Sequence, residues 1–123
     1  MTATKPPSMP NLKRGDVVLV LFPNSNLQTA KSRPALVVQR DKLQTKLPQV
    51  VLAMVSSNLS RAKHPSRVSV SLATPEGKQS GLLTDSVVMT DNLATVMLSN
   101  ITRVVGSLPM SDVDSALRHT LNL

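Results

Sequence analysis

The sequence Lys31-Ser32-Arg33-Pro34 places a guanidinium next to a residue that restricts the backbone. Pro34 fixes its own φ angle and pushes Arg33 toward an extended conformation. Arg33 is therefore expected at a defined position where a loop meets a strand, and a guanidinium held there can bind a phosphate through two hydrogen bonds. Lys31 and Ser32 would add a charge and a hydroxyl. Because Arg-Pro pairs are common, the motif alone is equally compatible with an exposed surface arginine.

A second polar group, Ser56-Ser57-Asn58, directly follows an apolar stretch. Hydroxyls and amides at the end of a strand can donate hydrogen bonds to phosphate oxygens. The alternative is a capped turn, which Ser and Asn often form. Ser56 has no Gly-x-Ser-x-Gly setting and no convincing His/Asp pair, so the sequence does not favour a serine hydrolase.

A third candidate is the basic segment from residue 60 to residue 67, where Arg61, Lys63 and Arg67 could follow an RNA backbone. Its histidine, His64, is a candidate acid or base because an unperturbed imidazole has a pKa of about 6.5. A single histidine in a loop is more often simply solvated.

The positive charge of the chain is concentrated in one stretch. The formal net charge is +7, and eight of the 14 Lys and Arg residues, but only one of the seven Asp and Glu residues, lie between Lys31 and Arg67. Such an excess indicates a polyanionic partner. A solvated basic face is the alternative interpretation.

Several classes of site are disfavoured. The chain has no cysteine, and its two histidines, His64 and His119, lack ligand spacing. Asp85 and Asp91 could mimic a metal-binding pair, but Asp85 is expected to cap or flank a strand, and further carboxylates are missing. Phe22 is the only aromatic residue, so stacking platforms are not expected. We therefore expect no metal and no cofactor. Without a signal peptide or an apolar run of about 18 residues, we expect a cytoplasmic protein without membrane contact.

Short β-branched segments must position these groups. We expect strands at residues 16–22, 35–39, 49–55, 67–72, 85–89 (with a possible extension to Leu93) and 102–106, with loops at 24–32, 58–66 and 73–81. Ser111 and Asp114 fit a capping box before an amphipathic helix from Asp112 to Leu121. This pattern predicts a mainly β protein with a C-terminal helix: a small antiparallel or mixed barrel over residues 12–123, after a flexible tail over residues 1–11.

Six segments carry a further pattern in chain order. They are RGDVVLV (14–20), SRPALVVQ (32–39), AMVSS (53–57), PSRV (65–68), LTDSVV (83–88) and VDSALRHTLNL (113–123). Together they resemble the PemK/MazF family of toxin–antitoxin ribonucleases, and the likeness covers nearly everything from Leu12 onward. The resemblance implies an SH3-like barrel of the PemK/CcdB type.

The resemblance also implies a function. It predicts the toxin of a type II toxin–antitoxin system: a sequence-specific, metal-independent endoribonuclease in which the RNA 2′-OH attacks the adjacent phosphate. The family's key arginine falls on Arg33, and its catalytic threonine falls on Ser56. The implied partners are single-stranded RNA, a second copy of the chain, a cognate antitoxin and, through the complex with that antitoxin, operator DNA. The family's EQIRT segment becomes DNLAT (91–95) here, with no arginine at Ala94.

Three alternatives remain open. The chain could be a nucleic-acid-binding barrel without catalysis, or a gyrase inhibitor of the CcdB type, which would not need both Arg33 and Ser56. The changes at Asn92 and Ala94 also leave room for a family member that has lost its activity.

Overall fold

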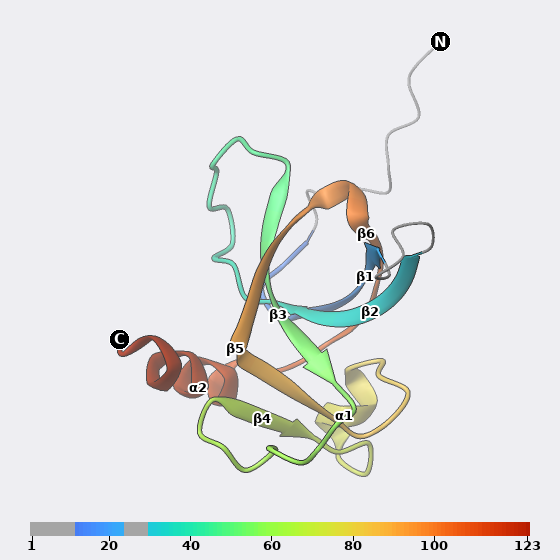
Figure 1. Cartoon of the computed structure of the whole chain (residues 1–123), viewed down its shortest axis with the longest axis vertical. Helices are drawn as coiled ribbons and strands as arrows, with labels where there is room; N and C mark the ends of the chain where they lie inside the picture. Colours follow the sequence, from blue (N-terminus) through green and yellow to red (C-terminus); the bar gives the residue numbers. More distant parts are fainter. Residues whose placement is uncertain (1–11, 24–29) are drawn as a thin grey trace.

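The fold is a strongly bent antiparallel sheet of six strands with one helix packed against its outer side (Figure 1). The computed structural model describes residues 12–23 and 30–123, so the tail expected over residues 1–11 and the loop residues 24–29 lie outside the described part. The elements in chain order are β1 (Asp16–Pro23), β2 (Ala30–Val37), β3 (Gln49–Ser56), β4 (Arg67–Val70), α1 (Pro75–Gln79), β5 (Ser86–Met97), η2 (Leu98–Asn100), β6 (Ile101–Ser107) and α2 (Ser111–Leu121).

The strands lie in the order β4-β5-β3-β2-β1-β6, and every neighbouring pair is antiparallel. This arrangement confirms the mainly β fold class with a C-terminal helix. β4 and β6 form the two edges of the sheet. β5 is a long, bent strand that runs across much of the molecule in Figure 1. Register shifts in the β1–β6 and β3–β5 ladders bend the sheet, as β-bulges commonly do.

Both faces of the central strands are buried, which explains why β1 is a continuous apolar run rather than an alternating one. Val18 and Val20 pack with Leu52 in the cluster inside the curl of the sheet. Val17 and Leu36 point to the other face and pack with Val113 of α2. β1, β2 and β3 therefore each contribute alternate residues to two separate cores.

β2 is longer than expected and begins at Ala30, before Pro34 rather than after it. Pro34 pairs with Leu19 of β1, but the ladder between β2 and β3 starts only at Ala35. A proline is tolerated here because its missing N–H falls where no pairing with β3 is required. The expected polar loop therefore ends before Ala30, and Lys31, Ser32 and Arg33 belong to a strand.

Other expected boundaries were also wrong: β5 continues to Met97, beyond residue 93, and β2 ends at Val37 rather than at residue 39. β4 stops at Val70 instead of residue 72, because the N–H of Leu72 donates to a carboxylate oxygen of Asp85 at 2.8 Å. The segment 73–81 contains a short helix, α1, whose first turn is capped by Thr74: its hydroxyl oxygen accepts from the N–H of Gly77 at 3.0 Å. The interaction with Leu72 confirms that Asp85 flanks a strand.

α2 begins at Ser111, one residue earlier than expected, and the predicted capping box is not formed. Its N-cap is Met110, which makes no side-chain capping hydrogen bond. The carboxylate of Asp114 instead forms an ion pair with Arg14 at 2.7 Å, and Arg14 also donates to the carbonyl of Val38 at 2.9 Å. Asp114 thus ties the first turn of α2 to the sheet.

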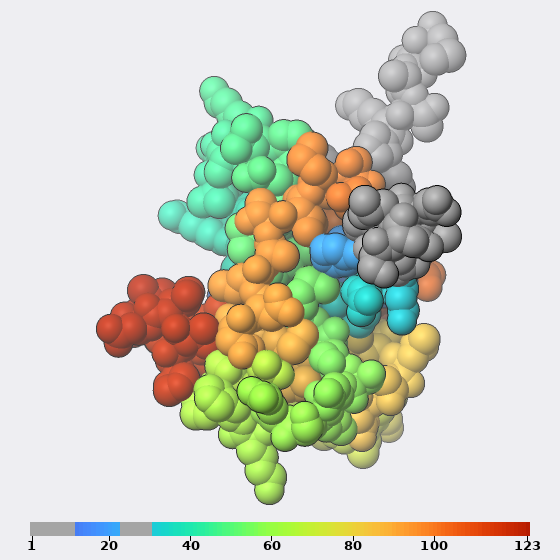
Figure 2. Space-filling model, viewed as in Figure 1, coloured from blue at the N-terminus to red at the C-terminus, as the bar shows by residue number. Residues whose placement is uncertain are grey.

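The loop between β2 and β3 and the C-terminal end of α2 project from the body of the molecule (Figure 2). Within residues 12–23 and 30–123, none of the helices is long and apolar enough to cross a bilayer.

Candidate active site

A cavity of about 820 Å³ opens where the ends of β2 and β3 meet β5 and the segment after α1. β2 contributes Lys31, Ser32 and Arg33, and the end of β3 contributes Ser56 with the following Ser57. These are both residues predicted to be catalytic and three of those predicted to bind RNA. The structure therefore gathers five of the ten predicted site residues around one cavity.

The strand register explains how Arg33 and Ser56 come to face the same space. Ala35 pairs with Met54 and Leu36 with Ala53 in the antiparallel ladder of β2 and β3. Arg33 lies two residues before Ala35 and Ser56 two residues after Met54, so both lie just beyond the paired end of this ladder. Because side chains alternate between faces, both then lie on the face that carries Ala35 and Met54.

The hydroxyl of Ser56 is oriented by the turn that follows β3. Its oxygen accepts a hydrogen bond from the N–H of Asn58 at 3.0 Å, and the side-chain oxygen of Asn58 accepts from the N–H of Ser60 at 3.1 Å. This is the capped turn expected for Ser and Asn. A hydroxyl that accepts from the backbone keeps its own hydrogen available, so Ser56 can cap the turn and donate to a ligand.

The described lining of the cavity is positively charged. Lys31 and Arg33 both contribute to it, whereas no Asp or Glu side chain does within residues 12–23 and 30–123. The remaining polar atoms come mainly from hydroxyls and one carboxamide, that of Asn92. Such a lining attracts an anion and offers it hydrogen-bond donors.

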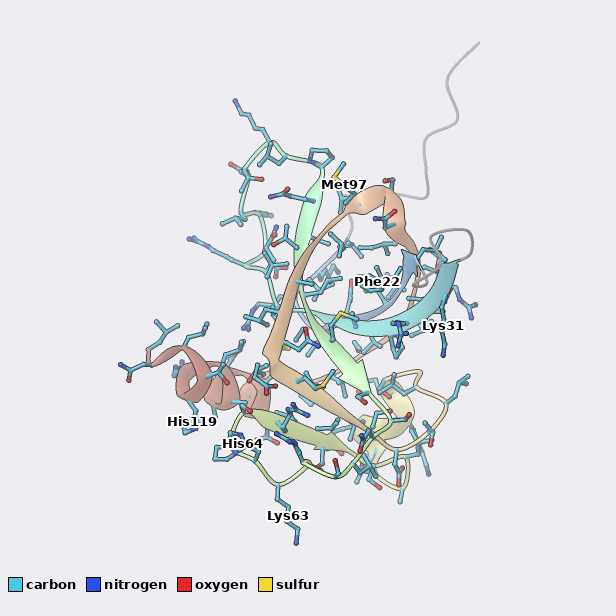
Figure 3. The ribbon with its side chains drawn as sticks, viewed as in Figure 1. Phe22, Lys31, Lys63, His64, Met97 and His119 are labelled. Atoms are coloured by element: carbon cyan, nitrogen blue, oxygen red, sulfur yellow. The ribbon has the colours of Figure 1, made fainter. Side chains whose placement is uncertain are left out.

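Three of the other predicted RNA-binding residues lie outside this cavity, in the loop between β3 and β4. Asn58 shapes the turn beside Ser56, as described above. Arg61 and Lys63 are exposed, and Lys63 points away from the body of the protein (Figure 3). Their contact with RNA stays a prediction, and it would extend beyond the cavity itself.

His64 does not line the cavity, so the structure does not favour it as the base for chemistry at Arg33. Its Nδ1 accepts a hydrogen bond from the N–H of Ser66 at 3.1 Å and lies 2.7 Å from the hydroxyl of Ser66. Its ring packs edge-on to that of His119 in α2, with centroids 6.2 Å apart. Figure 3 shows both histidines well apart from Lys31.

Arg67, also predicted to bind RNA, is occupied by a bidentate ion pair. Its Nε and Nη2 donate to the two carboxylate oxygens of Asp91 at 2.8 and 3.0 Å. The hydrogen bonds from Arg67 hold the pKa of the Asp91 carboxyl below its usual value. Asp85 therefore accepts a hydrogen bond from the backbone of the loop before α1, and Asp91 accepts hydrogen bonds from Arg67. Within the described part of the chain, no three His, Cys, Asp or Glu side chains gather where they could share a metal ion.

Sequence reasoning missed the contribution of β5 and of the segment 81–84 to the cavity. Phe22, Met54 and Met89 supply apolar surface, and Asn92 supplies the carboxamide. Leu83 is 97% exposed at the cavity lining, which is unusual for a leucine. One signal in the sequence could have revealed the contribution of β5. It is the polar run from residue 90 to residue 92, which interrupts an otherwise apolar strand.

Comparison with known proteins places this geometry in a family. Residues 13–121 match the family described as the PemK-like, MazF-like toxin of type II toxin–antitoxin systems. The chain belongs to the PemK/MazF toxin family. This MazF-like chain is 36% identical over 107 residues to endoribonuclease MazF6 of Mycobacterium tuberculosis, covering 84% of the chain and 90% of the relative. It is 29% identical over 116 residues to endoribonuclease EndoA of Bacillus subtilis, covering 91% and 96%.

Solved structures share the MazF-like fold. Toxin MazF-mt6 of Mycobacterium tuberculosis superposes with a TM-score of 0.66 at 22% identity, covering 88% of this chain and 97% of that one. A MazE–MazF structure from Deinococcus radiodurans gives a TM-score of 0.69 at 16% identity, covering 91% and 96%. The six-stranded sheet and its C-terminal helix are therefore those of MazF-like toxins.

Proposed function

We propose that this toxin is a metal-independent, sequence-specific endoribonuclease that cleaves single-stranded RNA at the cavity between β2 and β3. The observation that carries the proposal is the convergence of Arg33 and Ser56 on one cavity whose described lining has cations and no carboxylate. A carboxylate-free lining suits a polyanion and offers a catalytic divalent ion no acidic ligand. The curated relatives named above are endoribonucleases.

In the proposed reaction the RNA supplies its own nucleophile. The 2′ oxygen forms a bond to the adjacent phosphorus while the bond from phosphorus to the 5′ oxygen breaks. The 2′-OH proton passes to water, and the departing 5′ oxygen takes a proton from water. The products are a 2′,3′-cyclic phosphate and a 5′-hydroxyl.

Arg33 and Ser56 stabilise the charge that develops in this reaction. The guanidinium of Arg33 binds the non-bridging phosphate oxygens and remains protonated, because its pKa is above about 12. The hydroxyl of Ser56 donates to the same phosphate, and Lys31, Ser32 and Ser57 hold neighbouring groups. Together they fix the 2′ oxygen, the phosphorus and the 5′ oxygen in line and stabilise the phosphorane.

The proposed partners follow from family membership and charge. Structures of similar proteins include an endoribonuclease with its cognate antitoxin and a MazE–MazF complex. We infer that this chain acts in the cytoplasm as a homodimer and is neutralised by an acidic antitoxin segment. We also infer that it reaches operator DNA only within that complex. Mixing the purified protein with its cognate antitoxin, with and without operator DNA, tests neutralisation and DNA binding separately from catalysis.

A cleavage assay on defined RNA tests the proposed function. Replacing the scissile ribose by deoxyribose should abolish cleavage, whereas EDTA should leave it unchanged. R33A should lose at least about a hundredfold in rate, the scale for removing one transition-state donor. R40A is the matched control, because Arg40 is an exposed arginine beyond the other end of β2 and outside this cavity. Cleavage that survives in R33A, or that EDTA abolishes, would refute the proposal.

A further inference from the structure

The β3–β5 ladder contains an interruption that the proposed reaction does not use. Ala53 pairs with Leu93, but the next residue of β3, Met54, pairs with Met89. Residues 90–92 are therefore extra residues on β5 and form a large bulge. In Figure 1, β5 bends sharply beside α2. Bulges often re-aim a side chain next to a functional site.

The first two bulge residues are fixed to the surrounding structure. Thr90 is fully buried, and its hydroxyl donates to the carbonyl of Ser66 at 2.6 Å. Its oxygen lies 2.8 Å from the hydroxyl of Thr120 in α2, which must be the donor because Thr90 has already used its single hydrogen. Asp91 holds Arg67 through the bidentate ion pair. β4 and α2 thus hold the bulge from two sides.

The third bulge residue, Asn92, lines the cavity that contains Arg33 and Ser56. It supplies the one carboxamide of the described lining, among hydroxyls and cations. A carboxamide carries no charge and presents a donor and an acceptor side by side, so it pairs with a nucleobase edge better than with a phosphate. Met89, Ala94 and Phe22 also line this cavity and supply apolar surface on which the face of a base can pack.

We propose that Asn92 contacts a nucleobase flanking the scissile phosphate and determines the preference at that position, and that Thr90, Asp91 and Arg67 are positioning residues that hold it there. This inference rests on the proposed ribonuclease function. It assigns the bulge a role: the polar contacts of Thr90 and Asp91 hold the backbone that carries Asn92 at the cavity. Arg67 then acts on RNA recognition through Asp91, without touching the RNA itself.

Sequencing the cleaved ends of a randomised RNA pool tests the role of Asn92. The wild-type protein should show a preference at one nucleotide near the cut. N92A should flatten that preference by roughly 5- to 150-fold, the range expected for one bidentate base contact, while the preferences at other positions persist. An unchanged preference in N92A would refute the inference. A wild-type protein that cuts no RNA would instead refute the proposed function.

The positioning role is tested with the second ion pair as a matched control. D91N breaks the Arg67–Asp91 pair, and D114N breaks the Arg14–Asp114 pair, which also joins two elements but does not touch the bulge. D91N should reduce the preference at the position set by Asn92, D91E should restore part of it, and D114N should leave it intact. T120V removes only the donor to Thr90 and covers the case in which D91N does not fold. The positioning role is refuted if D114N flattens the preference as much as D91N does. It is also refuted if folded D91N, or T120V in its place, matches the wild type.

Discussion

The ion pair between Arg67 and Asp91 gives a stability prediction with a defined dependence on pH. Arg67 connects the start of β4 to the bulge of β5, and its side chain is 15% exposed whereas that of Asp91 is 41% exposed. We consider D91N, which keeps the shape of the side chain and removes its charge.

The magnitude follows from this geometry. Exposed ion pairs contribute about 0.2–1 kcal/mol to stability, and solvent around Asp91 screens the interaction. The bidentate geometry and the covered guanidinium place this pair at the upper end, because Arg67 would lose its charged partner while remaining largely out of water. We expect D91N to lower the free energy of unfolding by about 1 kcal/mol at pH 7, or about 4 °C in Tm.

The sign of the pH dependence follows from the pKa of Asp91, which the Arg67 hydrogen bonds lower in the folded state. The stabilisation is fully present above the unfolded pKa of about 3.9 and is lost as the pH falls through the lower folded pKa. The difference between wild type and D91N should therefore be largest near neutral pH and should shrink below about pH 4.

Urea unfolding of both proteins at pH 7 and at pH 3 or lower measures this difference directly. Comparing two proteins at each pH cancels the titration of the other carboxylates. A difference near zero at pH 7, or one that grows as the pH falls, would refute the reasoning.

Three further predictions follow from the core, one turn and the cavity. L36A removes a fully buried side chain from the core beneath α2 and should cost about 2–5 kcal/mol in urea unfolding; a loss below 1 kcal/mol would contradict this packing. G15A should cost about 1–2 kcal/mol, because Gly15 has a φ of +98° and an added Cβ would lie 3.0 Å from the carbonyl oxygen of Leu108; equal stability would contradict the turn geometry. K31A should make the salt dependence of binding to a deoxy-blocked RNA shallower by about 0.7 in the log–log slope, and an unchanged slope would place Lys31 away from the phosphates.

The sequence predicts the strands of this fold well where apolar residues dominate. Val17, Val18 and Val20 are apolar because they are buried on both faces of β1, and such a short apolar run is typical of a buried strand. Boundaries were harder because long-range partners decide them. Leu72 leaves the sheet because Asp85, 13 residues later, takes its N–H.

The candidate site was predictable in part. Arg33 and Ser56 follow from local motifs, and the structure places both in the lining of one cavity. The sequence drew attention to Asn92 only as a departure from the family's EQIRT segment. Its place at the cavity depends on the distant partners of Thr90 and Asp91, which local sequence does not show. Arg67 was assigned to RNA for the same reason: its charge is visible in the sequence, but its partner Asp91 lies 24 residues away.

The account depends most on the claim that Arg33 and Ser56 act on the same phosphate. A double-mutant cycle on single-turnover RNA cleavage tests it, using R33A, S56A and the double variant, with S56T as the control that keeps a hydroxyl. Groups that stabilise one transition state are not additive. We predict that S56T stays active and that the double variant loses little more activity than the worse single variant. Fully additive losses, or an S56A as active as the wild type, would contradict the account.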